Sequence, residues 1–289
     1  MFYELIDGKL TASQADKGVF AVFTIDDVAG VETFCNAEIT QLKKINKYST
    51  FLQGETGQLF IVNRAEEDAD SIQITKIRFF QTADKVACLT DDTEKIVEIA
   101  QSLEGVSITT IVPMMLSELI SDDNVYLELQ EKRLAELEAL FIKEKALYKS
   151  DELIKYRRKF LVLKRSYEQL LQCVSEAKKF AAEDAVTAFT ELEETLSGLT
   201  EDLLNLRDFV SQVREAFQEQ VDISLNTVMK FLTVVTSVFM PLSFIAGWYG
   251  MNLKMPEVKL EYGYLIPICL TIVISVVSVV YFVKKKWFR

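Results

Sequence analysis

The 289-residue chain contains no histidine and only four cysteines and four prolines. Without histidine, neither a His-containing zinc site nor a Ser-His-Asp triad can form. The cysteines are scattered singly, which favours reduced thiols in a cytosolic compartment over a disulfide framework; they are Cys35, Cys88, Cys173 and Cys269. No phosphate-binding loop and no nucleophile-base pair is visible, so the sequence does not support a membrane enzyme.

Charge is distributed unevenly along the chain. The net charge is −11, but residues 228–289 hold seven Lys or Arg and two acids, so this tail carries +5 and residues 1–227 carry −16. Such an acidic part repels nucleic acid and suits cations. With 49% apolar residues, the chain can bury a soluble core and still supply two membrane spans. The first 20 residues have no basic start and no apolar run, so we expect no cleaved signal peptide.

Two apolar runs are long enough to cross a bilayer. They are Val228–Tyr249 and Gly263–Val283, of about 22 and 21 residues, and a span needs roughly 20. The second run is followed by Lys-Lys-Lys-Trp-Phe-Arg, which the positive-inside rule assigns to the cytoplasm. We therefore expect a multi-pass protein of the cell membrane with both termini cytoplasmic and the loop 250–262 outside.

Ahead of the spans, the chain divides into two regimes. Residues 1–112 mix short β-branched or aromatic runs with a helical stretch near Glu94–Leu103, which predicts an α/β cytosolic domain. The runs are GVFAVFTI, QLFIVN, SIQITKIRFF, KVACLT and VSITTIV. From Pro113 onward, Leu, Glu, Lys and Ala dominate, which predicts long helices near 114–147, 151–181 and 185–249. The last helix would extend for roughly 100 Å at 1.5 Å per residue.

These patterns predict six segments in chain order. They are an α/β domain (1–112), a cytosolic helical region (113–183), a stalk helix continuing into the first span (184–249), an extracytoplasmic loop (250–262), a second span (263–283) and a basic cytosolic tail (284–289).

The periodicity of the predicted stalk helix indicates one polar face along its whole length. Counting back from Gly250 in alternating steps of three and four, every position is polar, small or Met. We call these positions the polar seam: Gly250, Gly247, Ser243, Met240, Thr236, Thr233, Met229, Asn226, Asp222, Glu219, Glu215, Gln212, Asp208, Asn205, Glu201, Gly198, Glu194 and Glu191. One step round the helix lies an apolar stripe that can pack on neighbours: Leu192, Leu196, Leu199, Leu203, Leu206, Val210, Val213 and Phe217. Positions that repeat every seven residues stay on the same side of a helix only if the helices supercoil around one another.

Each half of the seam also has an ordinary explanation. Acids on a helix usually form a solvated face, and small residues in a span usually form a packing surface. The shared register favours a pore-lining face instead, because Thr233, Thr236 and Ser243 are disfavoured against lipid. Two spans cannot enclose a channel, so we expect several copies to form a ring. Asn252 lies just beyond the seam, so the Asn252 side chains of several copies would form a ring of neutral amide oxygens suited to hydrated Mg²⁺.

The segment Asn226–Arg289 closely resembles the CorA family of divalent-cation transporters. It contains NTVMKFLTVVTSVFMPLSFIAGWYGMNLKMPE, then a second span and KKKWF, and the family signature is Tyr-Gly-Met-Asn after the first span. The resemblance implies a funnel-shaped homopentamer that moves Mg²⁺, with Co²⁺ or Ni²⁺ also passing, down the membrane potential. It implies no organic cofactor. The alternative is a zinc exporter of the same superfamily, against which the missing histidine and Met251 argue. A receptor-like or structural membrane protein comes third.

The resemblance also implies roles for individual residues. The selectivity signature comprises Gly250, Met251 and Asn252. The pore lining comprises Asn226, Met229, Leu232, Thr236, Met240 and Gly247, with Met229 and Leu232 as a hydrophobic gate. A basic ring at the cytosolic mouth comprises Lys284, Lys285 and Lys286, for which membrane anchoring is an equal alternative. Family regulation by cytosolic Mg²⁺ between subunits points to Glu191, and its partner stays open among Asp16, Asp26, Asp27 and Asp91.

Overall fold

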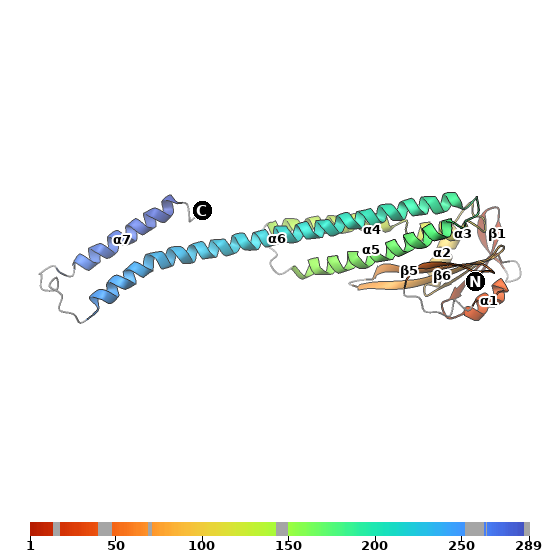
Figure 1. Cartoon of the computed structure of the whole chain (residues 1–289), viewed down its shortest axis with the longest axis horizontal. Coiled ribbons are helices and arrows are strands. Elements are labelled where there is room, and N and C mark those ends of the chain that lie inside the picture. Colours follow the sequence, from red (N-terminus) through yellow and green to blue (C-terminus); the bar gives the residue numbers. More distant parts are fainter. Residues whose placement is uncertain are drawn as a thin grey trace. The chain divides into compact units, whose positions relative to one another are not determined.

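The computed structural model describes residues 1–13, 18–39, 48–68, 71–142, 150–251, 263 and 265–285. They form two compact units, Met1–Arg214 and Glu215–Arg289. One long helix, α6 (Val186–Tyr249), contributes residues to both units (Figure 1).

The first unit is built on a seven-stranded sheet with the order β2-β1-β3-β7-β6-β5-β4. The strands are β1 (Phe2–Ile6), β2 (Lys9–Ser13), β3 (Phe20–Thr24), β4 (Thr50–Gln53), β5 (Gln58–Asp68), β6 (Ser71–Gln81) and β7 (Val86–Thr90). Only β3 and β7 pair in parallel, and the other neighbours are antiparallel. The predicted α/β class of this region is therefore confirmed.

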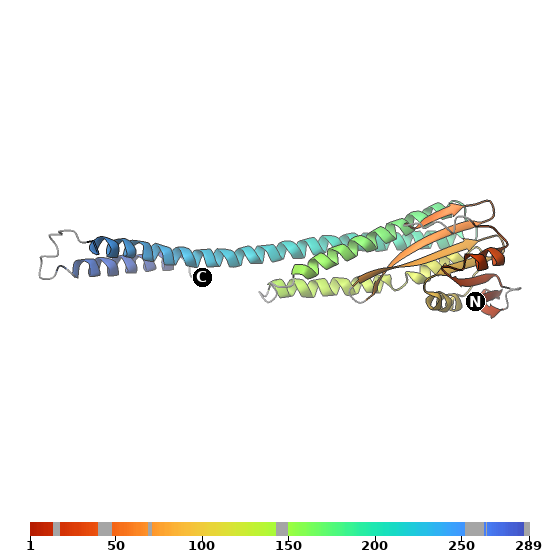
Figure 2. The ribbon, with the colours of Figure 1, turned by 90° about the horizontal axis from the view of Figure 1, so that it is seen from below.

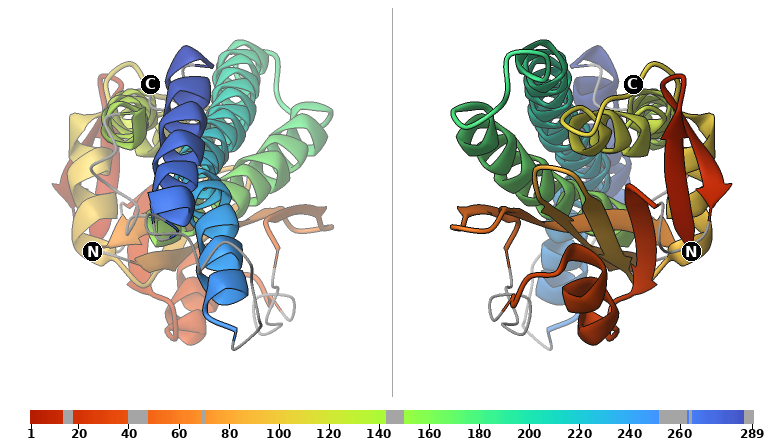
Figure 3. Two further views of the ribbon diagram at one scale, coloured as in Figure 1. Left: turned by 90° about the vertical axis from the view of Figure 1, so that its left-hand side faces the viewer. Right: turned by 90° about the vertical axis from the view of Figure 1, so that its right-hand side faces the viewer.

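Both faces of the sheet are covered by helices (Figure 3). On one face, α1 (Val28–Cys35) packs Val31 and Phe34 against a cluster of strand residues. That cluster comprises Ala21, Phe23, Leu59, Ile61, Phe80, Ala87 and Leu89. On the other face, the ring of Phe60 stacks on Phe189 of α6, with 6.2 Å between centroids. Because both faces are buried, a central strand such as β7 is apolar along most of its length and buried throughout.

Three long helices lie on the second face of the sheet. They are α4 (Asp123–Ile142), α5 (Ser150–Lys178) and the N-terminal part of α6, with α4 and α5 on opposite sides of α6 (Figure 3). The predicted apolar stripe of α6 is confirmed, since its members from Leu192 to Val213 are each at most 5% exposed. Phe217, the last member, is half-buried. The stripe therefore forms the core of this helical layer.

The helix predicted for 114–147 is wrong as a single element. The structure has α3 (Ile111–Leu119) and then α4, with a turn at residues 120–122 between them. The break coincides with Ser, Asp and Asn at residues 121–124, which favour the start of a helix, and Asp123 at the start of α4 also pairs with Arg64 of β5. The separation predicted between the helices 151–181 and 185–249 is confirmed, since α5 ends at Lys178 and α6 begins at Val186.

The run VSITTIV is not a strand, contrary to prediction. The amide of Ser107 donates to Oγ1 of Thr110 at 2.8 Å, which makes a turn directly before α3. Ser and Thr hydroxyls offer the backbone such local partners in place of a strand ladder. The predicted helix near Glu94–Leu103 is confirmed as α2 (Thr93–Ser102). The strands β1, β2 and β4 and the helix α1 were not predicted.

A buried ionic cluster joins β5 to the surrounding helices. The guanidinium of Arg64 lies 2.8 Å from the carboxylate of Asp123, and the two side chains are only 10% and 11% exposed. The hydroxyl of Tyr167 on α5 donates to the same carboxylate at 2.8 Å. Burial raises the pKa of Asp123, and the positive charge of Arg64 opposes that shift. Lys95 of α2 contacts Glu66 at 2.6 Å, so the cluster links β5 to three helices.

The edge of β5 is closed by side chains where β4 ends. Strand β4 pairs with β5 only from Gln58 to Ile61. Beyond that point, the amide of Asn63 donates to Oγ of Ser49 at 3.0 Å and the amide of Ala65 donates to Oγ of Ser166 at 3.2 Å. The Ser166 hydroxyl in turn donates to the carbonyl of Asn63 at 3.0 Å. A serine of α5 thus replaces the missing neighbouring strand.

We predict that Asp123→Ala lowers the melting temperature of the whole chain in detergent. The change leaves the buried Arg64 guanidinium without its carboxylate, and removing one partner of a buried pair costs roughly 3–5 kcal/mol. The control is Glu104→Ala, which removes the carboxylate of an exposed pair with Lys9 and should leave the melting temperature unchanged. Equal effects of the two substitutions would contradict a structural role for the buried cluster.

Candidate ion pathway

The second unit is a pair of apolar helices. The C-terminal part of α6 and α7 (Leu265–Lys284) lie side by side (Figures 1 and 2). Both are long and apolar enough to cross a membrane, with mean hydropathy of 1.8 and 2.6 in their most apolar parts. Val234, Ile245 and Phe282 are buried in this unit, while most other large apolar side chains stay exposed. An apolar outer surface on closed helical backbone is what a bilayer requires.

The polar seam of α6 is exposed along its entire length. All its positions from Glu191 to Gly250 are solvent-exposed in the single chain. Between residues 191 and 215, exposure distinguishes the seam from the rest of the helix, because the apolar stripe on the neighbouring side is buried. Between residues 222 and 233 every position is exposed, so exposure does not distinguish the seam there.

The predicted pore-lining residues share one face of α6. The helix is continuous and includes Pro241. At roughly 100° per residue, Met229, Thr236, Met240 and Gly247 fall within about 20° of one line, and Asn226 and Leu232 lie about 60° from it on opposite sides. A Cβ added at Gly247 would meet no atom within 4 Å apart from the neighbouring backbone of α6 itself. The single chain therefore assembles this face and leaves it uncovered.

Two threonines of this face are less polar than the sequence indicates. The hydroxyls of Thr233 and Thr236 donate to the carbonyls of Met229 and Leu232, each at 2.8 Å. A hydroxyl bonded within its own helix can face lipid without an unsatisfied donor. The expectation that these side chains need a water-filled axis is therefore weakened, and their polarity alone does not assign the face to a pore.

Gly250 occupies a crowded position at the end of α6. Its amide donates to the carbonyl oxygen of Ala246 at 2.9 Å, and a Cβ built on Gly250 would lie 2.9 Å from that same oxygen. The amide of Met251 donates to the carbonyl of Trp248 at 3.3 Å, and its side chain is 57% exposed. Asn252, the third residue of the signature, lies outside the described residues.

The candidate basic ring is described in part. Lys284 ends α7, and the ammonium of Lys285 lies 5.4 Å from the centroid of the Tyr281 ring, within range of a cation–π contact. Lys286 lies outside the described residues.

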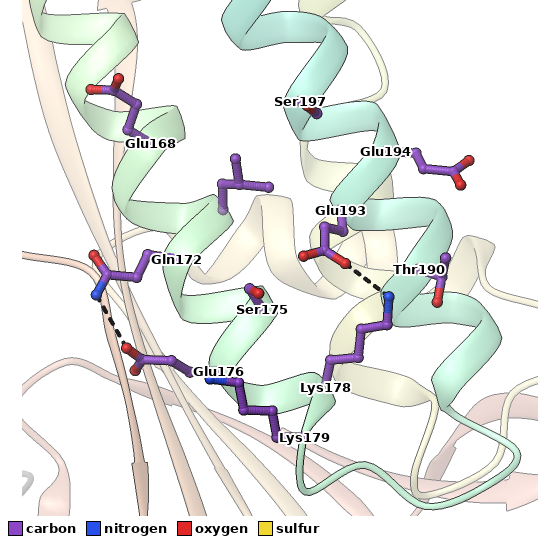
Figure 4. Close-up of a pocket in the computed structure, with 11 residues that line it drawn as sticks. Glu168, Gln172, Ser175, Glu176, Lys178, Lys179, Thr190, Glu193, Glu194 and Ser197 are labelled. Atoms are coloured by element: carbon purple, nitrogen blue, oxygen red, sulfur yellow. Dashed lines mark hydrogen bonds and ion pairs between the residues drawn. The ribbon is translucent and has the colours of Figure 1, made fainter.

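Near Glu191, α5 and α6 form a groove of about 790 Å³ (Figure 4). Its carboxylates are Glu168, Glu176, Glu193 and Glu194. Lys178 contacts Glu193 at 2.8 Å and lowers the pKa of that carboxyl, while Glu194 points away from the groove. Across the part of the chain that the structure describes, no three Cys, Asp or Glu side chains gather as metal ligands. The single chain therefore does not complete a metal site around Glu191.

The proposed partners of Glu191 differ in their availability. Asp26 and Asp91 are exposed. Asp27 caps α1, where its carboxylate accepts a hydrogen bond from the amide of Gly30 at 3.0 Å. Asp16 lies outside the described residues. Among the described residues, no group of three or more potential metal ligands contains Glu191 together with Asp26, Asp27 or Asp91.

This order of elements, an α/β unit followed by a long helix and a second apolar helix, also occurs in known proteins. The family model described as CorA-like Mg²⁺ transporter protein matches residues 32–286. The chain belongs to this family. CorA-like proteins are transporters and not enzymes, in agreement with the sequence.

Individual CorA proteins are similar over parts of the chain. The cobalt/magnesium transport protein CorA of Thermotoga maritima is 39% identical over 105 residues, which cover 36% of this chain and 30% of that protein. The magnesium transport protein CorA of Wolinella succinogenes is 31% identical over 145 residues, covering 42% of this chain and 45% of that protein. The matched segments therefore span less than half the length of either relative.

The CorA fold extends further than the sequence similarity. The complete structure of the CorA magnesium transporter from Methanocaldococcus jannaschii aligns with a TM-score of 0.81 at 15% identity, covering 96% of this chain and 93% of that one. The α/β unit, the long helix and the two apolar helices are therefore shared as a fold.

We predict opposite tolerance at the two glycines near the end of α6. Gly250→Ala would force a methyl group against the carbonyl oxygen of Ala246, so the melting temperature of the detergent-solubilised chain should fall by several degrees. Gly247→Ala is the matched control, because its methyl meets open space and Ala is favoured over Gly inside a helix. Equal melting temperatures for the two variants would show that the helix end adapts without strain.

Proposed function

We propose that this protein forms a homopentameric ring in the cell membrane and conducts hydrated Mg²⁺, with Co²⁺ or Ni²⁺ also accepted, along α6. The observation that carries the proposal is the sequence Tyr-Gly-Met-Asn at the end of an apolar helix, within the residues that the CorA-like family model matches. The relatives from T. maritima and W. succinogenes are named as cobalt/magnesium and magnesium transport proteins.

The exposed face of α6 supports a pathway formed between copies. The described residues of one chain include two helices apolar enough to span a membrane, and two such helices cannot enclose a channel. Cyclic symmetry would repeat the same face of α6 around an axis. Gly250, Met251 and Asn252 would then surround the outer mouth. Neutral amide oxygens accept hydrogen bonds from the water that Mg²⁺ retains, and binding through that water lets the ion leave again.

Met229 and Leu232 are the proposed gate. Their side chains are 65% and 62% exposed in the single chain and have the apolar character of a constriction. Rings of such side chains close a narrow pore by dewetting. By the positive-inside rule, Lys284, Lys285 and Lys286 support a cytoplasmic end of the chain, where they would form a basic ring at the pore mouth or a membrane anchor.

Regulation by cytosolic Mg²⁺ is proposed through Glu191. Its carboxylate lies on the exposed polar seam, where neighbouring copies would bring further acids close. Carboxylates that face each other repel until a divalent ion bridges them. Asp26 and Asp91, both exposed, are the better candidates for the second ligand, because Asp27 is engaged in capping α1.

We predict that Asn252→Ala abolishes Mg²⁺ flux into proteoliposomes while the oligomer stays assembled, because the substitution removes one polar side chain of the signature and leaves the apolar helices unchanged. Flux of Mg²⁺ and of Zn²⁺ should be measured side by side to separate the proposed function from zinc transport. Gln101→Ala, which removes an exposed amide of α2, is the matched control and should conduct like the parent. Parental flux through assembled Asn252→Ala would rule out the selectivity role.

We predict that millimolar Mg²⁺ raises the melting temperature of the parent more than that of Glu191→Gln. An ion that binds one state stabilises that state by linkage, and the substitution removes a ligand without changing the size of the side chain. Glu98→Gln on α2 is the control and should respond like the parent. If potassium chloride at equal ionic strength gives the same stabilisation, the effect is screening and Glu191 is not a ligand.

A further inference from the structure

Helix α5 carries an exposed face that is both basic and apolar. No acid occurs between Leu153 and Tyr167, although residues 1–227 carry a net charge of −16. Lys159 and Lys164 are engaged with Glu67 and Glu168. The exposed members of this stretch, which we call the basic face, are Ile154, Lys155, Arg157, Arg158, Leu161, Val162 and Arg165. None of its four cations forms an ion pair within the described residues.

The C-terminal end of the basic face borders a groove of about 530 Å³. Leu161, Val162 and Arg165 of α5 line one wall, and Ile74 and Lys76 of β6 line the other. Ile74 and Leu161 are 56% and 55% exposed, so apolar surface lies open beside two positive charges. No carboxylate lines this groove among the described residues. An occupant would need apolar side chains flanked by acids.

A groove of opposite charge lies between α4 and α6. It has a volume of about 590 Å³, and its charged residues are Glu128, Glu131 and Asp202, with no Lys or Arg among its described lining residues. Leu206 and Phe209 supply apolar surface. We call this groove the acidic face. Helix α4 lies on the opposite side of α6 from α5, so the two faces belong to opposite flanks of the helical layer (Figure 3).

We propose that the basic face of one copy docks against the acidic face of the next copy. This inference rests on the proposed ring and names the contact that closes it in the first unit. A contact between two different surfaces of the same chain is heterologous, and repetition of such a contact closes a ring when the rotation allows it. Complementary charge selects the partner, and covering Ile74 and Leu161 removes apolar surface from water.

A second copy fits better than another acidic partner. The chain itself supplies both surfaces, three carboxylates on one flank and unpaired arginines on the other. Each face also carries apolar side chains next to its charges: Leu161 is exposed on the basic face, and Leu206 and Phe209 line the acidic face. Contact between the two faces would therefore pair opposite charges and bury apolar side chains in the same interface.

The test is a charge-reversal cycle on the full-length chain in detergent at low salt. R158E/R165E sets acid against acid, E128K/E131K sets base against base, and the fourfold variant restores opposite charges. We expect each double variant to raise at least tenfold the protein concentration at which rings dissociate, and the fourfold variant to return it to within about threefold of the parent. K179E/R207E changes the net charge as much as R158E/R165E but lies outside both faces, and it should assemble like the parent.

Cross-linking between copies gives a second readout that does not depend on ring dissociation. The combination of L161C on α5 and N124C on α4 should yield a ladder of covalent multimers with a short bismaleimide. Either substitution alone, or the pair combined with R158E/R165E, should yield no more multimers than the parent.

The outcomes separate this inference from the proposed function. A parent chain that is monomeric in detergent overturns the ring and the docking together. A parent ring that both charge reversals and the cross-linker leave unchanged overturns the docking alone, while Mg²⁺ flux through that ring would keep the proposed function. Loss of binding to phosphatidylserine vesicles in R158E/R165E, with assembly unchanged, would assign the basic face to anionic lipid and overturn the docking.

Discussion

Burial of the apolar stripe of α6 is the interaction on which the arrangement of the first unit depends. From Leu192 to Val213 the stripe is removed from water, and this fixes which side of α6 faces the rest of the unit. The burial of this side of α6 has two consequences. The polar seam must stay outward, and α4 and α5 are held on opposite flanks of α6, each with its own exposed chemistry (Figure 3). Since the helix is unbroken to Tyr249, the same period continues while the seam changes from acids to small residues and methionine.

The sequence was most informative where periodicity reflects burial. The stripe, both apolar helices and α2 could be predicted because each repeats one physical pattern over many residues. The break at residues 120–122 was missed, although Ser, Asp and Asn at residues 121–124 are types that favour the start of a helix. The ion pair of Asp123 with Arg64 at that point could not be predicted, because the two residues lie far apart in the chain. The short strands β1, β2 and β4 are four or five residues long and leave a weak periodic signal.

For the candidate pathway, the sequence predicted a set of pore-lining residues, and their role stays a prediction; α6 is continuous through the segment that carries them. The sequence could not reveal that Thr233 and Thr236 satisfy their hydroxyls within the helix, because that depends on the side-chain rotamer. Among the described residues, no metal-ligand group forms around Glu191. A site between copies would depend on the symmetry of the assembly, which the sequence of one chain does not contain. Residue-level resemblance to CorA was dense only around the spans, whereas the shared fold covers 96% of the chain at 15% identity.

The serine that closes the edge of β5 has a consequence for solubility. An open strand edge offers unpaired amides and carbonyls to any other strand, and this is a common route to aggregation. Where β4 ends, the carbonyl of Asn63 and the amide of Ala65 have no neighbouring strand. The hydroxyl of Ser166 donates to that carbonyl and accepts from that amide. The protection lasts only while α5 stays on the sheet. A displacement of α5 would uncover the amide of Ala65 and the carbonyl of Asn63, and another strand could then pair with this edge.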